Sequence, residues 1–201
     1  VSDSLYWSGG TMGGAGVTTL HDTIIAEIAG GSWKYLDTRT INNYGTVVWT
    51  ADGTYREVRG SNGAVFNNLA GAVFDAQSVA EFSFTGTGTR PIFANDGTVS
   101  RTGTTGPFEI QLEFNNGSTG TVEVESGTLN LTGGGTSTGA FATIAGGTID
   151  FGGGVHTLDA ASAITGDGGV SFTNDGATTI EGSYSVTGTT IVDNTATVNF
   201  N

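Results

Sequence analysis

The chain has 201 residues, of which 35 are glycine, 2 are proline and none is cysteine, and its formal net charge is −13. The absence of cysteine excludes disulfides, thiolate zinc sites and thiol catalysis, and the negative charge argues against binding to nucleic acids or to anionic membrane surfaces. Only 12% of the residues are charged while 11 are Phe, 5 Tyr and 3 Trp, a balance typical of a folded chain rather than a disordered one.

Residues 1–32 resemble the rest of the chain least, and we expect them to form an N-terminal strand within a capping or assembly segment. The strand is SLYW, and the glycine-rich SGGTMGGAG follows it. Leu5, Tyr6 and Trp7 are therefore candidates for an assembly strand donated to a neighbouring molecule. The next stretch, HDTIIAEIAGG (21–31), fits either two helical turns or a strand; its alternation and closing Gly-Gly favour the strand.

Residues 33–126 repeat a phrase in which asparagine precedes a Gly-Thr-Val or Gly-Ala-Val step. The four occurrences are INNYGTVVW (41–49), VFNNLAGAVFD (65–75), IFANDGTVS (92–100) and LEFNNGSTGTVEV (112–124). The glycines that head the steps are Gly45, Gly71, Gly97 and Gly120, so their spacing is nearly constant. A phrase that returns at a nearly fixed period indicates one structural coil per period.

The repeated asparagines are Asn43, Asn68, Asn95 and Asn116. An asparagine amide both donates and accepts hydrogen bonds, so amides stacked one coil above another can form a ladder. Asparagine and the following glycine also tolerate left-handed backbone angles, which suits a tight corner. We therefore predict a structural asparagine ladder; the alternative is a row of amides that binds a ligand.

Residues 127–201 repeat more regularly and with a shorter period, which we expect to be roughly 20–22 residues. GTLNL, GTIDF and GGVSF begin at Gly127, Gly147 and Gly168, and we expect FATI, VHTL and TTI to be the second strands of these coils. Short apolar–polar alternations between turn residues are the signature of strands.

The sequence predicts an all-β fold, a single-stranded parallel β-solenoid (a right-handed β-helix) of about nine coils of roughly 20–27 residues. A β-sandwich or jelly roll is the alternative, because Asn62-Gly63 and Asn116-Gly117 are typical hairpin dipeptides.

No catalytic residue, cofactor or metal ligand is assigned, and we expect the protein not to be an enzyme. His21 and His156 lie in different coils without a nucleophile motif, and all six cations precede residue 102. The acids are scattered; Asp150 and Glu125 are the candidates for neighbours on stacked coils. The Gly166–Val170 and Asn174–Thr178 segments carry oxygen ligands without the nonapeptide spacing of calcium-binding rolls.

Two further features concern carbohydrate. Asn116 and Asn130 begin N-x-Ser/Thr sequences and are candidate glycosylation sites. Trp33 and Trp49 are the tryptophans nearest one another, and a cluster of tryptophans and acids on one face would favour a polysaccharide-binding or polysaccharide-cleaving β-helix, the alternative function.

The run from Gly120 to Phe172, together with LDTRTINNYGTVVW (36–49) and FNNLAGAVFD (66–75), resembles repeats of large bacterial secreted and cell-surface proteins. Those repeats are similar to the β-solenoid stalks of filamentous-haemagglutinin-type and autotransporter adhesins. The resemblance covers the chain from about residue 33 to its end. It implies a parallel β-solenoid, an extracellular or cell-surface location, and a structural or adhesive role, and it supplies no catalytic residues.

The last predicted strand, TVNF, continues the strand pattern, so Val198 and Phe200 are candidates for assembly contacts. We expect a non-catalytic structural protein that assembles head-to-tail with itself, or continues into flanking repeats of a larger protein, in a fibre or adhesin stalk. Surface glycans are the other candidate partner. No run of residues approaches the roughly 20 apolar residues of a membrane span.

Overall fold

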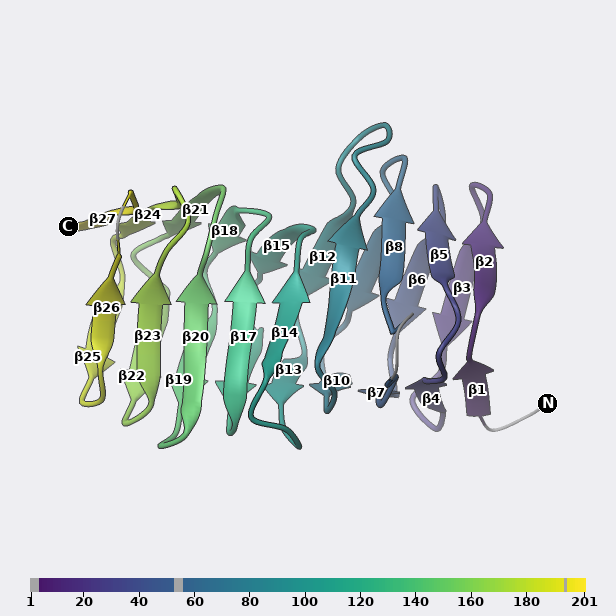
Figure 1. Cartoon of the computed structure of the whole chain (residues 1–201), viewed down its shortest axis with the longest axis horizontal. Helices are drawn as coiled ribbons and strands as arrows, with labels where there is room; N and C mark the ends of the chain where they lie inside the picture. Colours follow the sequence, from purple (N-terminus) through teal and green to yellow (C-terminus); the bar gives the residue numbers. More distant parts are fainter. Residues whose placement is uncertain (1–3, 53–55, 194) are drawn as a thin grey trace.

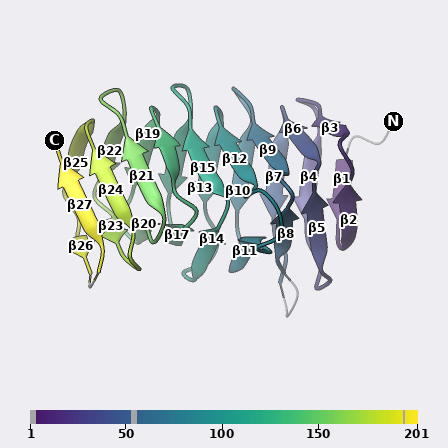
Figure 2. The ribbon, with the colours of Figure 1, turned by 90° about the horizontal axis from the view of Figure 1, so that it is seen from above.

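The computed structural model describes residues 4–52, 56–193 and 195–201, and in these residues every regular element is a strand. The strands form three sheets of nine strands each, and the first and last described coils lie at opposite ends of an elongated stack (Figure 1). Turning the molecule shows the same succession of coils along the long axis (Figure 2).

Sheet A contains the first strand of every coil: β1 (Ser4–Trp7), β4 (Ile25–Ile28), β7 (Thr46–Trp49), β10 (Val73–Ala76), β13 (Thr98–Arg101), β16 (Thr121–Val124), β19 (Ala140–Thr143), β22 (Ala163–Gly166) and β25 (Ser183–Val186). Sheet B contains the second: β2 (Gly10–Gly13), β5 (Lys34–Asp37), β8 (Val58–Ser61), β11 (Ala80–Phe84), β14 (Pro107–Ile110), β17 (Gly127–Leu131), β20 (Gly147–Phe151), β23 (Gly169–Phe172) and β26 (Thr190–Val192). Sheet C contains the third: β3 (Val17–Leu20), β6 (Thr40–Asn43), β9 (Val65–Asn68), β12 (Ile92–Asn95), β15 (Glu113–Asn116), β18 (Gly135–Ser137), β21 (Val155–Leu158), β24 (Ala177–Ile180) and β27 (Thr197–Phe200).

The fold is a β-solenoid of nine coils, as the repeat predicted. Each strand pairs with the strand three places on, and all pairings between described strands are parallel. Coil length varies: measured between the starts of successive sheet A strands, the longest coil runs from Thr46 to Val73 and the shortest from Thr121 to Ala140. The sandwich alternative is wrong: Asn62 and Gly63 do have the positive φ angles of 50° and 68°, but they connect β8 to β9 in a different sheet and close no hairpin.

The register corrects two alignments made from the sequence. Val73 pairs with Thr46 and Thr98, so Ala72, not Gly71, is the counterpart of Gly45 and Gly97. FATI belongs to β19 in sheet A, whereas VHTL and TTI lie in β21 and β24 of sheet C. The true counterpart of VHTL is β18, a short Gly-Thr-Ser strand that has no apolar side chain to reveal it.

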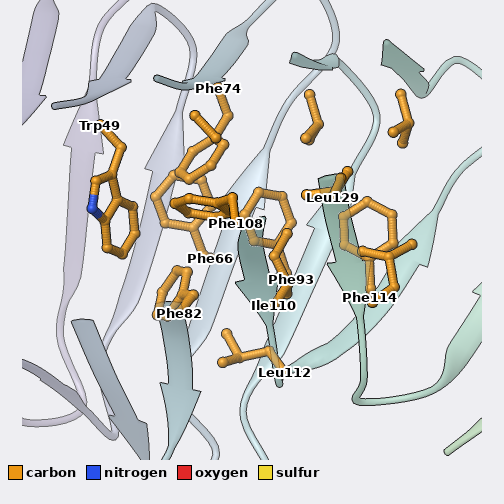
Figure 3. Packing of buried hydrophobic residues seen from close by; sticks show 14 of the residues in the cluster. Trp49, Phe66, Phe74, Phe82, Phe93, Phe108, Ile110, Leu112, Phe114 and Leu129 are labelled. Carbon is orange, nitrogen blue, oxygen red and sulfur yellow. The ribbon is translucent and has the colours of Figure 1, made fainter. Parts of the chain in front are cut away.

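The core is a column of side chains that point inward from all three sheets. Strands such as β6, β7, β9 and β12 alternate between half-buried and buried residues, which is the expected pattern when one sheet face is inside. The rings of Phe66, Phe93 and Phe114 stack coil upon coil with centroid distances of 4.9 and 5.4 Å (Figure 3). Trp49 of sheet A packs edge-on against Phe108 of sheet B, and the centroids of their rings are 5.0 Å apart.

The corner from sheet C to sheet A alternates strictly between four and two residues. The four-residue corners are 21–24, 69–72, 117–120 and 159–162, and the two-residue corners are 44–45, 96–97, 138–139 and 181–182. Each four-residue corner closes a turn by a hydrogen bond from its fourth N–H to its first carbonyl, for example Ala72 to Leu69 at 2.9 Å. The structural repeat is therefore a pair of coils.

A glycine ends each two-residue corner because a larger residue does not fit. A Cβ on Gly97 would lie 2.4 Å from the oxygen of Ala72 and 2.5 Å from that of Leu69, which are the fourth and first residues of the preceding four-residue corner. Gly45, Gly139 and Gly182 meet the same two carbonyls of the corner before them. The glycine therefore permits the short corner to rest against the longer one.

The N-terminal segment is built like the others. β1, β2 and β3 form the first coil, and β1 pairs with β4 of its own chain from Ser4↔Ile25 to Trp7↔Ile28. The glycine-rich stretch SGGTMGGAG contains β2. HDTIIAEIAGG contains β4, so the strand interpretation was correct.

Candidate functional site

The structure stacks Asn43, Asn68, Asn95 and Asn116 at the ends of β6, β9, β12 and β15. The Nδ2 of Asn43 donates to the Oδ1 of Asn68 at 2.9 Å, and the next two steps of the ladder are 2.8 Å each. None of the four residues is more than 1% exposed. A ligand therefore has no access to these amides.

The remaining donors of the ladder bind the main chain of sheet A. Asn68 Nδ2 also donates to the Thr98 carbonyl at 2.9 Å, and Asn116 Nδ2 donates to the Ala140 carbonyl at 3.1 Å. The amide thus joins the end of one sheet C strand to the start of the sheet A strand two coils further along the chain. This second role of the amide was not expected from the sequence.

The predicted left-handed backbone angles are not found at these four asparagines. They are the last residues of extended strands, and the non-glycine residues with positive φ among those described are Thr38, Asn62, Asn174 and Asp175. Of the four glycines that follow the ladder residues in the repeated phrase, only Gly71 has a positive φ. Asparagine is needed here for its amide, and glycine mainly for its lack of a side chain.

The two histidines lie far apart in the stack and have different surroundings. His156 is 3% exposed, and its Nε2 donates to the carbonyls of Gly153 and Leu131 at 2.8 and 3.1 Å. Burial lowers the pKa of His156, and the two carbonyl contacts oppose that shift. His21 is exposed in the first four-residue corner. Both contacts of His156 are thus to main-chain carbonyls.

An acidic row, which we define as Glu57, Glu81, Glu109 and Asp150, runs along the outside of sheet B. Glu81 lies beside Glu109 in the register, and burial, followed by the charges of Glu109 and Glu57, raises the pKa of Glu81. Burial also raises the pKa of Asp150, although hydrogen bonds from Ser171 and Thr173 oppose that effect.

The acidic row does not form a metal site in the described chain. No group of three or more His, Asp or Glu side chains there could hold a metal ion, and Asn130 separates Glu109 from Asp150. Glu57 is paired with Arg59 at 3.0 Å. The expected neighbour pair was wrong, because Glu125 lies just after β16 of sheet A while Asp150 lies in β20 of sheet B.

Two buried cations were not anticipated. Lys34 and Arg101 are fully buried, and they donate to main-chain carbonyls and, for Arg101, also to the Thr104 hydroxyl, rather than to acids. Arg101 donates to the carbonyls of Ala76, Thr102, Thr104 and Gly106 and so holds the loop after β13. Burial lowers the pKa of both groups.

The tryptophans do not form a common face. Trp49 is fully buried and its Nε1 donates to the Arg56 carbonyl at 3.2 Å. Trp33 is half-buried, and the guanidinium of Arg59 covers its ring at 3.4 Å from the centroid. This arrangement leaves no open pair of tryptophan rings for stacking against sugars.

The two candidate glycosylation sites differ. Asn116 belongs to the ladder and is 1% exposed, so the folded chain does not present its amide nitrogen for modification. Asn130 is half-buried on the outside of sheet B. The segment Gly166–Val170 runs from the end of β22 into β23, and Asn174–Thr178 leads into β24, so both include strand residues.

The candidate assembly residues lie in the first and last coils. Leu5 and Trp7 point toward the core, and Tyr6 is exposed on the outside. Val198 is half-buried, and Phe200 is 52% exposed although its ring lies 5.1 Å from that of Tyr184.

Comparison with known proteins finds no matching family model, no similar curated protein and no similar solved structure. In the described part of the chain, no helix has the length and apolar character needed to cross a membrane.

Proposed function

We propose that the chain is a non-catalytic structural protein of the cell surface or extracellular matrix, a β-solenoid subunit or segment that assembles head-to-tail into a fibre or an adhesin stalk. The observation that carries this proposal is the unbroken stack: the same three strands and one continuous core recur in every described coil. The core and all three sheets continue to the first and last described coils, where the outer edges of β1–β3 and β25–β27 have no strand beside them.

The internal polar groups support the same proposal. The ladder amides, His156, Lys34 and Arg101 all bond within the chain, in positions that hold coils or corners together. Polar groups that serve binding or catalysis are instead usually directed into a pocket.

The donor-strand form of assembly has less support than end-to-end stacking. β1 already pairs with β4 of its own chain, and its residues Leu5 and Trp7 contribute to the core. Donation of β1 to a neighbour would break these contacts, whereas stacking of complete coils would keep them.

Electron microscopy of the purified chain over a range of concentrations tests the proposal. Rods that lengthen as the concentration rises are the expected result. Particles that stay one solenoid long at all concentrations would contradict self-assembly. Glycan-array binding or polysaccharide depolymerisation would instead favour the polysaccharide alternative, which the buried Trp49 and the covered ring of Trp33 do not support.

A further inference from the structure

We infer that the two ends of the solenoid are complementary in register, so that β25, β26 and β27 of one copy pair with β1, β2 and β3 of a second copy as though the second copy were the tenth coil. The inference rests on the proposed head-to-tail assembly and specifies which residues meet at the joint.

The last coil leaves core side chains uncovered. We call a set of residues that the strand pairing places above one another in successive coils a column. Val192 and Phe200 are 53% and 52% exposed, although Phe172 and Ile180, which precede them by one coil in their columns, are each 1% exposed. Tyr184, Val186 and Val198 are half-buried for the same reason. Each of these side chains packs on the coil before it and has nothing above it within the described chain.

The first coil offers matching positions. Following each column through the paired strands places Tyr184 in the column of Leu5, and Val186 in that of Trp7. The same procedure places Phe200 in the column of Leu20. A tenth coil with the side chains of the first would therefore continue three inward columns with apolar residues, and the larger Trp7 would meet the smaller Val186.

Two small residues of the first coil lie in the columns of Val192 and Val198. Val192 shares its column with Gly10, and Val198 shares its column with Thr18. A Cβ on Gly10 would meet nothing within 4 Å, so that column has room for Val192, whereas the Thr18 hydroxyl already accepts a hydrogen bond from Arg39 Nε at 2.7 Å.

Charge favours contact between unlike ends. Residues 163–201 contain four carboxylates and no cation, whereas residues 4–43 contain three carboxylates and two cations. Contact between two C-terminal ends would bring together two uncompensated acidic coils, which repel each other. Contact of a C-terminal end with an N-terminal end reduces this repulsion and preserves parallel pairing.

The chain contains no cysteine, so engineered disulfides can report the register directly. Thr19→Cys and Asn199→Cys place thiols on exposed, outward-facing residues of one column. Residues opposite one another on paired strands are about 4.8 Å apart, within the Cα range of a disulfide. Equal amounts of the two single variants are mixed and oxidised mildly, and the mixed disulfide should exceed the half of all dimers that random collision produces.

The matched control replaces Asn199→Cys with Ser185→Cys. Ser185 is equally exposed on the last coil, but it shares its column with Tyr6 rather than Thr19. The mixture of Thr19→Cys and Ser185→Cys should give only random cross-linking. Equal yields in both mixtures would overturn the in-register joint, and predominance of the Asn199→Cys homodisulfide would show that like ends meet.

A second variant tests the apolar contact. Phe200→Asp should reduce the mixed disulfide between the Thr19→Cys and Asn199→Cys chains several-fold, whereas Ser185→Asp, which adds the same charge on the outside, should reduce it less. The circular dichroism of each variant shows whether the last coil still folds. Rods in the microscope without the mixed disulfide would refute the register while leaving head-to-tail assembly intact; a single-length particle with no cross-link would refute both.

Discussion

At the scale of single residues, this protein uses polar side chains mainly to join one coil to the next. The ladder amides bond to one another and to sheet A carbonyls, and the buried cations and His156 bond to carbonyls of corners and loops. A buried donor or acceptor left without its partner is costly, so each of these contacts should be visible in the stability of the fold.

Asn95→Ala should lower the free energy of unfolding by about 1–3 kcal/mol, because it leaves Asn116 Oδ1 without the amide donor that lies 2.8 Å away. Asn67→Ala is the matched control on the neighbouring strand β9, where the half-buried Asn67 points outward and donates to Asn42. Urea unfolding of the two variants gives the comparison. A similar loss in both would contradict a special role for the buried ladder.

Gly97→Ala should destabilise the fold by about 1–3 kcal/mol, since its Cβ would overlap two carbonyl oxygens of the preceding corner. Gly31→Ala is the control: its Cβ would lie 3.7 Å from the nearest atom, the Asp52 oxygen, and its φ is not positive. We expect the control to change the free energy by less than about 1 kcal/mol. Thermal unfolding measured by circular dichroism decides between these outcomes.

His156 should make stability fall as the pH drops below about 6.5. Burial lowers its pKa in the folded chain, so between the folded and unfolded pKa values the unfolded chain holds more protons, and acid favours unfolding. The raised pKa values of Glu81 and Asp150 act in the opposite direction at lower pH, because there the folded chain holds the extra protons.

The His156 contribution is isolated by comparing the unfolding free energies of wild type and His156→Gln at pH 7.5 and 5.0. The wild type should lose more stability than the variant over this interval, by up to about 1.4 kcal/mol per pH unit. Parallel pH profiles would mean that the burial of His156 does not affect its titration.

At the scale of elements, the alternation of corners makes two coils the natural unit of the fold. Every two-residue corner rests on the carbonyls of a four-residue corner. Its last residue is glycine because a Cβ there would overlap these carbonyl oxygens. Removing an even number of coils preserves this order, whereas removing one coil places two corners of the same length next to each other.

Deletion of residues 46–97, two coils, should therefore leave a cooperatively folding protein in which the 44–45 corner is followed by the four-residue corner 117–120. Deletion of residues 46–72, one coil, should give the less stable chain although it removes fewer residues, because Gly97 would then rest on the 44–45 corner. Urea titration of both deletions is the measurement; greater stability of the single-coil deletion would contradict the paired repeat.

At the scale of the whole molecule, the solenoid is a linear stack in which each coil contacts only its neighbours, so stability should decrease toward uncovered ends. The central coils contain the ring cluster of Phe66, Phe93 and Phe114 (Figure 3). In contrast, β25–β27 are largely exposed. The ends are thus the parts of the fold that would gain most from a further coil.

Hydrogen exchange should show this gradient. Amides of β9, β12 and β15 should exchange slowest and those of β25–β27 much faster in dilute solution. If copies stack, protection of β25–β27 should rise with concentration while that of the central coils stays unchanged. Uniform exchange at all concentrations would contradict both the gradient and the covering of the ends.

The sequence by itself determined the fold class, the parallel stacking and the four ladder positions. These follow from periodicity, since residues that recur once per coil must lie above one another. The tertiary structure alone decided the exact register at Ala72, the short β18, the alternation of corners and the internal bonding of Lys34 and Arg101. Those features depend on which main-chain atoms approach each other between coils, and one-dimensional spacing does not record such contacts.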